Sequence, residues 1–433
     1  MSVDFLPNSS APVTRIDLAT GLTEFPREVF DHADTLEILN LTGNQLTSLP
    51  EDLGRLSKLK ILFCSNNRFS HLPAVLGTLP SLTMIGFRAN QIESIDPDAF
   101  PPHLRWLILT ENRLRSLPAT LGRCRALQKL MLSGNSLSSL PEEMAACEHL
   151  ELLRLAANQF EVLPDWLLCL PRLAWLALAG NPCMQSGSSA LDKVKTVPWG
   201  ELTLQKKLGE GASGVISQAR WSACDNDVAV KVFKNAITSD GLPLCELEAS
   251  LGVGEHPNLT RVLGPVSGHP DGASGMVMEL IDPSFTSLAG PPSFDTCTRD
   301  VYPAGQLFAL EETLAIVRGI ASAMAQMHVH GILHGDLYAH NILVAGGGRS
   351  LLSDFGAAAF YDLQAGPASH LERLDVRAFG ILMEELLERT CVLHADTGVS
   401  QALSGVTRDC LNADVSQRPN FQELVSHLLR LES

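Results

Sequence analysis

The sequence predicts two parts of different fold class: an α/β array of short repeats in residues 1–184, and a domain of mixed strands and helices in residues 199–433. In the first part, an asparagine recurs at steps of 22 or 23 residues. In the second part, a glycine-rich string, an aspartate with a nearby asparagine, and an Asp-Phe-Gly string follow one another in order. A chain of 433 residues is long enough for two or more domains.

Each repeat of the first part has leucines in phase with its asparagine. In the first complete unit, Leu36, Leu39 and Leu41 precede Asn44, and Leu49-Pro50 follows it. The alternation at Leu39 and Leu41 predicts a short strand whose leucines point inward. The asparagine amide can bond backbone groups of neighbouring turns, so we interpret it as structural. The repeat asparagines are Asn44, Asn67, Asn90, Asn112, Asn135, Asn158 and Asn181.

This pattern resembles the leucine-rich repeat family across residues 13–184. The resemblance implies an α/β solenoid of about eight units, the first of them a degenerate N-terminal cap. The family likeness also implies a module that binds proteins.

One column of the repeats is unusually apolar for a surface. The residue before the second leucine of each strand should face the concave side, and its neighbour two residues on should do the same. A contiguous apolar stripe usually marks a contact surface, so we expect a docking face for a protein or for the chain's own second domain. The alternative is that curvature lets these side chains cover one another. The apolar members are Ile38, Ile61, Phe63, Met84, Trp106, Ile108, Met131, Leu152 and Trp175.

Charge and hydropathy exclude several classes of partner. The net charge is −16, of which residues 1–184 contribute about −4 and the remainder about −12, so nucleic acid is not an expected partner. The chain opens without a basic-then-apolar leader and has no apolar run of the ~20 residues that a membrane span needs. The ten cysteines form no CxxC pair. We expect a soluble, unprocessed, cytoplasmic protein with reduced thiols.

A linker is expected over residues 185–198, where serine and glycine interrupt the repeat composition. A glycine loop follows, Leu208-Gly209-Glu210-Gly211-Ala212-Ser213-Gly214, and Val228-Ala229-Val230-Lys231 comes soon after it. Glycines allow backbone N–H groups to approach phosphates without a clash with Cβ.

Three acidic or amide side chains complete a set for phosphoryl transfer. Asp336 lies in His334-Gly335-Asp336-Leu337, Asn341 follows five residues later, and Asp354 opens Asp354-Phe355-Gly356. The reaction needs a phosphate cradle, a lysine, two metal ligands and a carboxylate aimed at the incoming hydroxyl. We therefore predict Asp336 as the base, and Asn341 and Asp354 as oxygen ligands of Mg²⁺.

From residue 199 to the end, these motifs resemble the eukaryotic-type protein kinase family, closest to its tyrosine-kinase-like branch. Together with the repeats, the chain resembles the composite repeat-kinase proteins of bacteria and plants. The resemblance implies a bilobal α+β fold that uses ATP and Mg²⁺. It also implies that Lys231 pairs with a helix glutamate, either Glu246, which we prefer, or Glu248. The positions implied to contact ATP are Leu208, Gly209, Glu210, Gly211, Ala212, Ser213, Gly214, Ile216, Ala229, Lys231, Met278, Glu279, Leu280 and Leu343.

Further positions match the family's scaffold. A helix is predicted from Glu311 to Met327, and His334 is expected to pack against Phe355. Asp375 resembles the start of a helix with a DxxxxG pattern, and Arg418 resembles the closing Arg-Pro motif.

The sequence departs from the family at three places. Gly335 replaces the arginine before the catalytic aspartate, and Tyr338 replaces the lysine two residues after it. The stretch between Asp354 and Asp375 is short and has no Ala-Pro-Glu motif, which leaves Arg418 with only Glu372 as a weak substitute partner.

The sequence thus predicts an ATP- and Mg²⁺-dependent kinase of protein hydroxyls, serine/threonine by family likeness, with the repeats as its docking module. Two alternatives stay open: a nucleotide-binding pseudokinase that acts as a scaffold, and a kinase of small molecules.

Overall fold

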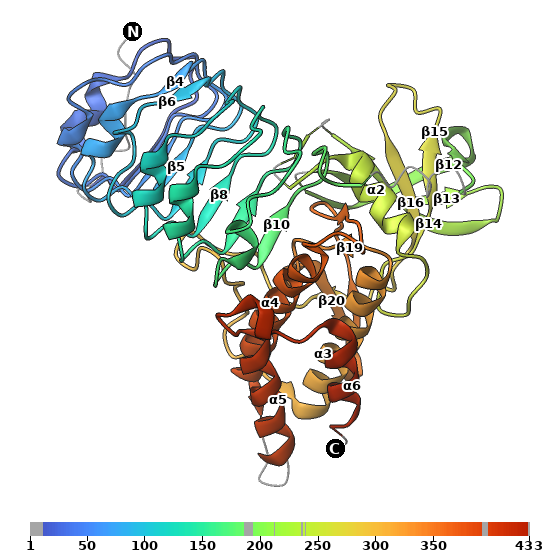
Figure 1. Cartoon of the computed structure of the whole chain (residues 1–433). Helices are drawn as coiled ribbons and strands as arrows, with labels where there is room; N and C mark the ends of the chain where they lie inside the picture. The colour runs from blue at the N-terminus through green and yellow to red at the C-terminus, as the bar shows by residue number, and fades with distance from the viewer. Residues whose placement is uncertain are drawn as a thin grey trace. The chain divides into compact units, whose positions relative to one another are not determined.

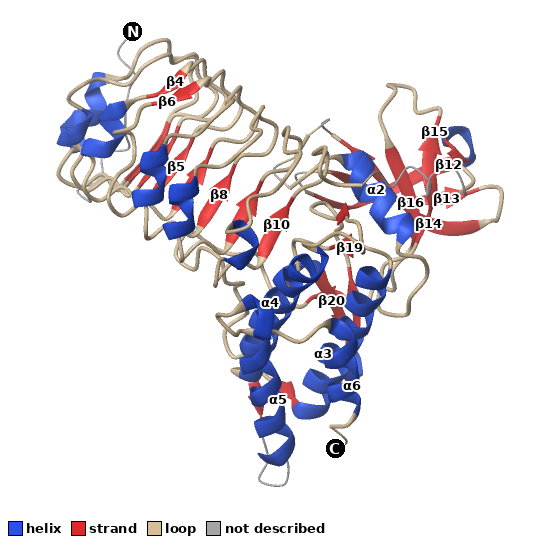
Figure 2. Ribbon diagram, viewed as in Figure 1, coloured by secondary structure: helices blue, strands red, loops and turns tan. Residues whose placement is uncertain are grey.

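The computed structural model describes residues 12–185, 194–211, 213–234, 237–238, 240–391 and 397–431. The chain forms two compact units (Figures 1 and 2). The first unit contains residues 1–130 and 140–147, and the second contains residues 131–139 and 148–433. The repeats from residue 148 onward therefore belong to the same compact unit as the second part of the chain. The predicted boundaries at residues 184 and 199 stay predictions, and most of the predicted linker lies outside the described residues.

The first unit is a ladder of short parallel strands. Strands β1 (Arg15–Asp17), β2 (Ile38–Asn40), β3 (Ile61–Phe63), β5 (Met84–Gly86) and β7 (Trp106–Ile108) pair in this order, each in register with the next. The central leucine or isoleucine of each strand is buried, and its two neighbours face the other side. This is the strand geometry that the LxL alternation predicts.

Short 3₁₀ helices and two small strands complete the repeats. The helices are η1 (Arg27–His32), η2 (Leu53–Arg55), η3 (Ala74–Thr78), η4 (Ala119–Arg123) and η5 (Glu142–Ala146), and β4 (His71–Leu72) pairs with β6 (Ser94–Ile95).

The repeat asparagines satisfy backbone groups inside the turns. Asn44 Nδ2 donates to the carbonyls of Leu18 and Leu41 at 2.7 and 2.8 Å, and its Oδ1 accepts from the amides of Thr20 and Leu22. The hydrogen bonds join adjacent repeats, so the asparagine is structural, as the sequence predicts.

The predicted apolar column is partly self-covered in the first unit. Ile61 and Met84 are only 8% and 4% exposed, and the Phe63 ring fills the space beside Gly86. Lys129 Nζ lies 4.3 Å from the centre of the Trp106 ring. For these residues the alternative interpretation, that neighbours cover one another, applies in part. Ile38, Phe63, Trp106 and Ile108 remain half-buried.

The second unit begins with the last repeats, which contain β9 (Leu152–Arg154), β10 (Trp175–Ala177) and η6 (Leu167–Cys169). A six-stranded sheet follows in the order β11-β15-β16-β14-β13-β12. Its strands are β11 (Val197–Pro198), β12 (Leu202–Glu210), β13 (Gly214–Trp221), β14 (Asn226–Phe233), β15 (Val262–Ser267) and β16 (Gly275–Glu279). Helix α2 (Pro243–Gly252) lies beside this sheet (Figure 1).

The longer helices gather at the other end of the second unit (Figure 2). They are α3 (Leu310–Val329), α4 (Ala368–Leu387), α5 (Thr397–Cys410) and α6 (Phe421–Leu429). Small strands border them: β17 (Thr286–Ser287), β18 (Phe308–Ala309), β19 (Ile332–Leu333), β20 (Ile342–Ala345), β21 (Arg349–Leu352), β22 (Ala359–Phe360) and β23 (Thr390–Cys391). A sheet-rich end and a helix-rich end fit the predicted bilobal α+β arrangement.

The helix predicted from Glu311 to Met327 is α3, which is longer by a few residues at its ends. Its buried face joins one core with α4, α6 and the last repeats, because Leu152 and Trp175 belong to the same apolar cluster as Met324 and Phe379. Within the described part of the chain, no helix combines the length and apolarity that a membrane crossing requires.

Candidate active site

The sheet-rich end holds a buried lysine–glutamate pair. Lys231 on β14 donates to Glu246 on α2, and their side chains are 8% and 3% exposed. Glu246 is thus the glutamate that faces Lys231, as preferred over Glu248. Burial raises the pKa of Glu246 to about 7, although the charge of Lys231 opposes this rise.

The glycine loop joins β12 to β13. Gly211 N donates to Gly214 O at 3.0 Å, and Glu210 accepts from Lys207 and Lys234. These hydrogen bonds lower the pKa of Glu210 to about 2. A Cβ on Gly209 or Gly211 would meet no atom of the described residues within 4 Å, so the backbone there is open to a ligand. A Cβ on Gly214 would instead press on the Val232 carbonyl. Ala212 lies outside the described residues.

Asp375, within helix α4, organises residues 334–341, which we call the catalytic loop because they contain the predicted base Asp336. Its carboxylate accepts from the amides of His334 and Gly335 at 2.8 and 3.0 Å and bonds His328 Nε2 at 3.0 Å. The sequence placed Asp375 at a helix start, and this is wrong: α4 already begins at Ala368. Residues 368–374, about a third of the stretch between Asp354 and Asp375, therefore belong to the helix.

His334 is fully buried and packs on Phe355, with ring centres 5.7 Å apart, as predicted. Burial lowers the pKa of His334 and therefore favours its neutral form.

Asp336 is held from two sides. Its Oδ2 accepts from Asn341 Nδ2 at 3.0 Å, and its Oδ1 accepts from Arg154 Nη2. The Asp336 side chain is 14% exposed. Burial by itself would raise the pKa of Asp336, but the charge and hydrogen bond of Arg154 and the charges of His340 and His334 together outweigh burial, so the pKa is lowered.

Arg154 was not among the predicted site residues, although its strand column was. It ends β9 in the last repeats and is 2% exposed. Besides Asp336, its guanidinium donates from Nη1 to Gly335 O at 2.8 Å and from Nε to Asp240 Oδ1 at 2.9 Å. The available signal was its charge, at a strand position that is apolar in three other repeats, as Phe63, Ile108 and Met131.

Two of the three places where the sequence departs from the family, Gly335 and Tyr338, contact the last repeats. Gly335 has φ +69°, and a Cβ there would overlap the carbonyl of Leu176 on β10. Tyr338 stacks on Trp175 with ring centres 4.2 Å apart and planes 6° from parallel. Trp175 Nε1 also donates to Leu337 O at 2.9 Å. The glycine and the tyrosine therefore both suit a repeat strand that packs on the catalytic loop.

More contacts of the last repeats surround this one. Glu151 accepts from Thr298 and from Arg299, and the carbonyls of Arg172 and Pro171 accept from Arg377 and Arg418. Ala156 and Ala177 pack on Ala357, just after the Asp-Phe-Gly string, and Gln185 N donates to Phe360 O. Leu152, Trp175 and these neighbours thus contact the chain's own second part.

Arg418 donates hydrogen bonds to backbone carbonyls, where the family pattern would provide a glutamate carboxylate. Its guanidinium donates to the carbonyls of Asn412, Arg373 and Pro171, and it is 1% exposed. Glu372, the weak substitute that the sequence suggested, instead accepts from Phe421 N at 2.9 Å. Burial lowers the pKa of Arg418 to about 9.

The two predicted metal ligands lie on neighbouring segments. Ser353, next to Asp354, donates from its amide to Asn341 O at 2.9 Å. Asn341 uses its amide nitrogen on Asp336, so its amide oxygen is the atom available to a cation. Asp354 is exposed and sits at φ +58°. Carboxylate and amide oxygens are ligands that Mg²⁺ prefers, so this pair fits that ion.

Three of the residues implied to contact ATP lie at strands of the second unit. Met278 and Glu279 end β16 and pair with Ala229 and Val228 on β14, while Leu343 lies on β20. A pocket of about 580 Å³ includes Glu279 and Leu280 but neither Lys231 nor Asp336.

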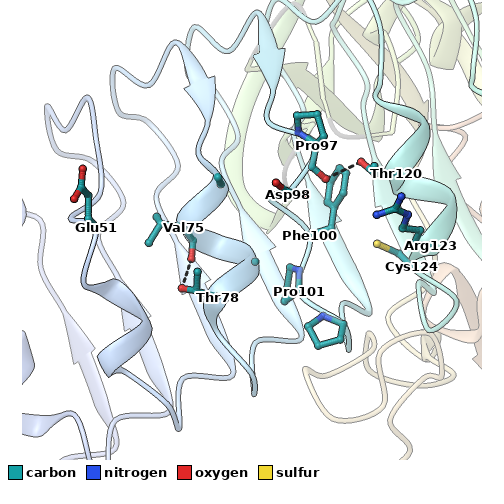
Figure 3. A pocket seen from close by; sticks show the side chains of 13 residues that line it. Glu51, Val75, Thr78, Pro97, Asp98, Phe100, Pro101, Thr120, Arg123 and Cys124 are labelled. Carbon is teal, nitrogen blue, oxygen red and sulfur yellow. Dashed lines mark hydrogen bonds between the residues drawn. The ribbon is translucent and has the colours of Figure 1, made fainter.

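A second pocket, of about 610 Å³, lies in the first unit between η3, η4 and residues 97–102. Figure 3 shows its side chains, with Thr120 donating to Pro97 O at 2.8 Å. None of the predicted catalytic residues lines it.

Comparison with known proteins agrees with this geometry. Residues 202–377 match the family described as protein tyrosine and serine/threonine kinase, and residues 34–92, 80–137 and 125–182 match leucine-rich repeats. The chain therefore combines leucine-rich repeats with a domain of the tyrosine and serine/threonine protein kinase family.

Among curated proteins, it is similar to fibroblast growth factor receptor 1 of Xenopus laevis, 25% identical over 304 residues, which is 57% of this chain and 37% of the receptor. The receptor of the same name from Pleurodeles waltl is 24% identical over 282 residues, 53% of this chain and 34% of the receptor. The match thus spans little more than a third of each relative's length.

Proposed function

We propose that the chain is an ATP- and Mg²⁺-dependent kinase that transfers the γ-phosphate to protein hydroxyls, with serine or threonine preferred. The observation that carries this proposal is the Lys231–Glu246 pair, formed in the same unit as an Asp336 that is held by Asn341. A lysine fixed by a buried glutamate can hold the α- and β-phosphates, and Asp336 can orient the hydroxyl and accept its proton. Mg²⁺, held by Asn341 and Asp354, would neutralise phosphate charge.

The choice of hydroxyl rests on family likeness alone. The matched family includes tyrosine as well as serine/threonine kinases. Phosphoamino-acid analysis of the autophosphorylated chain decides between them, because each phosphorylated residue type is recovered separately.

A second function, that of a pseudokinase scaffold, is favoured by one observation. The last repeats cover Gly335 and Tyr338 of the catalytic loop, which limits the approach of a peptide.

The half-buried apolar residues of the first unit are proposed as the docking face for a protein partner under either function. They are Ile38, Phe63, Trp106 and Ile108.

The test compares the intact chain with Asp336→Asn in a radiolabelled-ATP transfer assay. We expect turnover to fall ~10²-fold or more with nucleotide affinity nearly unchanged, because a general base acts mainly on the chemical step. Asp354→Ala should instead weaken the binding of Mg-ATP. Equal transfer by the intact chain and Asp336→Asn would reject the kinase and favour the scaffold.

A further inference from the structure

Arg154 joins three segments that are far apart in the sequence. Its strand, β9, lies in the last repeats, while its acceptors are Asp240 before α2, the Gly335 carbonyl and the Asp336 carboxylate. The side chain is 2% exposed, so the guanidinium is removed from water and every one of its nitrogens has a protein acceptor. A planar guanidinium fixes the direction of each bond it makes, which a lysine would not do.

The contact orients the reacting carboxylate rather than consuming it. Among the described residues, one side chain donates to each oxygen of Asp336, Arg154 to Oδ1 and Asn341 to Oδ2. An ionised carboxylate has about four acceptor positions, so two fixed donors leave room for a substrate hydroxyl. With both oxygens held, the carboxylate plane cannot rotate, and the position of its remaining lone pairs is set before substrate binds.

The residues on either side of Asp336 also contact the last repeats. Gly335 leaves the space that the Leu176 carbonyl occupies, and Tyr338 presents its ring to Trp175. Both residues flank Asp336. Asp240, the other acidic partner of Arg154, precedes Gly241, which packs on the carbonyl of Gly356 beside Asp354. Arg154 therefore links the loop that carries Asp336 to the segment that leads into the helix of Glu246.

We propose that Arg154 is a positioning residue for phosphoryl transfer, supplied by the repeats to the kinase's catalytic loop. It places a cation next to Asp336, where Tyr338 provides none, and it holds the carboxylate in the orientation that a hydroxyl requires. The last repeats then contribute a residue to the active site, in addition to the docking role proposed for the repeats. This inference rests on the proposed kinase activity.

The test uses the full chain with Arg154→Ala, Arg154→Lys and, as control, Arg113→Ala, an exposed repeat arginine that pairs with Glu93. We expect Arg154→Ala to lower kcat ~10²-fold, because a misplacement of about 1 Å costs this much. The KM for ATP should change less than about threefold. Arg154→Lys should recover part of kcat, since it keeps the charge, and added guanidinium should rescue Arg154→Ala. Arg113→Ala should match the intact chain.

A second readout does not depend on activity. Hydrogen–deuterium exchange of residues 333–341 should rise in Arg154→Ala and stay unchanged in Arg113→Ala. If the intact chain transfers no phosphate but this exchange rises, the proposed activity fails while the positioning contact stands. The positioning role is overturned if kcat of Arg154→Ala is unchanged. It is equally overturned if kcat of Arg154→Ala increases, which would show that Arg154 blocks Asp336. It is also overturned if Arg154→Ala lowers kcat and the melting temperature and raises KM together, and Arg154→Lys restores none of them.

Discussion

At the scale of single residues, the stack of Trp175 on Tyr338 is the most specific contact between the last repeats and the catalytic loop. Both rings are buried, at 1% and 5% exposure, and both belong to one apolar cluster. The Tyr338 hydroxyl is buried without a hydrogen-bond partner among the described residues. The ring therefore stabilises the contact, while the hydroxyl destabilises it.

Substitutions at Tyr338 should separate these two effects. Tyr338→Phe keeps the stack and removes an unsatisfied hydroxyl, so we expect stability to be unchanged or raised by about 1 kcal/mol. Tyr338→Ala removes the stack and leaves a cavity, and should cost roughly 3–5 kcal/mol. Scanning calorimetry checks both. A melting temperature of Tyr338→Phe well below that of the intact chain would show that the hydroxyl has a partner, such as an ordered water.

Sequence reasoning identified most of the site at this scale because short motifs keep fixed spacings. Lys231, Asp336, Asn341 and Asp354 lie in strings whose chemistry can be recognised locally. Arg154 could not be found in this way, because its bond to Asp336 joins positions 182 residues apart. The partner of an arginine depends on tertiary packing, and its column was interpreted by its apolar members alone.

At the scale of elements, helix α4 carries a carboxylate that is unfavourably buried. Glu385 is 8% exposed and accepts from Asp300 N and Tyr302 Oη, both at 3.3 Å. Burial, together with the nearby charge of Asp300, raises the pKa of Glu385 from 4.5 to about 7. The protonated form is therefore the one that the folded chain favours.

This burial predicts a pH-dependent effect of Glu385→Gln. A raised folded-state pKa gives stability that is complete below about pH 4.5 and is lost as pH rises through about 7. A shift of this size corresponds to on the order of 3 kcal/mol. Glutamine carries no charge, so Glu385→Gln should melt near the intact chain at pH 5 and above it at pH 8. Glu388→Gln, at a 66% exposed side chain, is the control. A constant difference at both pH values would contradict the prediction.

The elements themselves were predictable to different degrees. The ladder of the first unit follows from a period of 22 or 23 residues, because each unit repeats one strand and one asparagine. The start of α4 was misplaced at Asp375, since the chain between Phe360 and Ala368 is too short to hold the usual loop and the helix extends into it. The spacing of apolar residues in the sequence predicts which positions are buried. The residue at which a helix begins depends also on the space that neighbouring segments leave for it.

At the scale of the whole molecule, the change of composition near residue 184 does not coincide with the division into compact units. The repeats after residue 148 share a core with α3, α4 and α6. Polar contacts reinforce this core, among them Glu151 with Arg299 and the Pro171 carbonyl with Arg418. The covalent link across residues 185–198 is therefore not expected to be the main connection between repeats and kinase.

This organisation predicts that the chain stays together after it is cut. A protease site inserted at residue 188 of the full-length protein should, once cleaved, give two pieces that elute as one species in size-exclusion chromatography. Trp175→Ala removes a central buried anchor, which commonly costs about 2 kcal/mol or more, so the cleaved pieces should separate at roughly 30-fold higher concentration than those of the parent. Trp106→Ala, a half-buried tryptophan of the first unit, is the matched control and should elute like the parent. Separation of the cleaved parent at micromolar concentration would show that the contacts of the last repeats with the catalytic loop are too weak to hold the kinase without the linker.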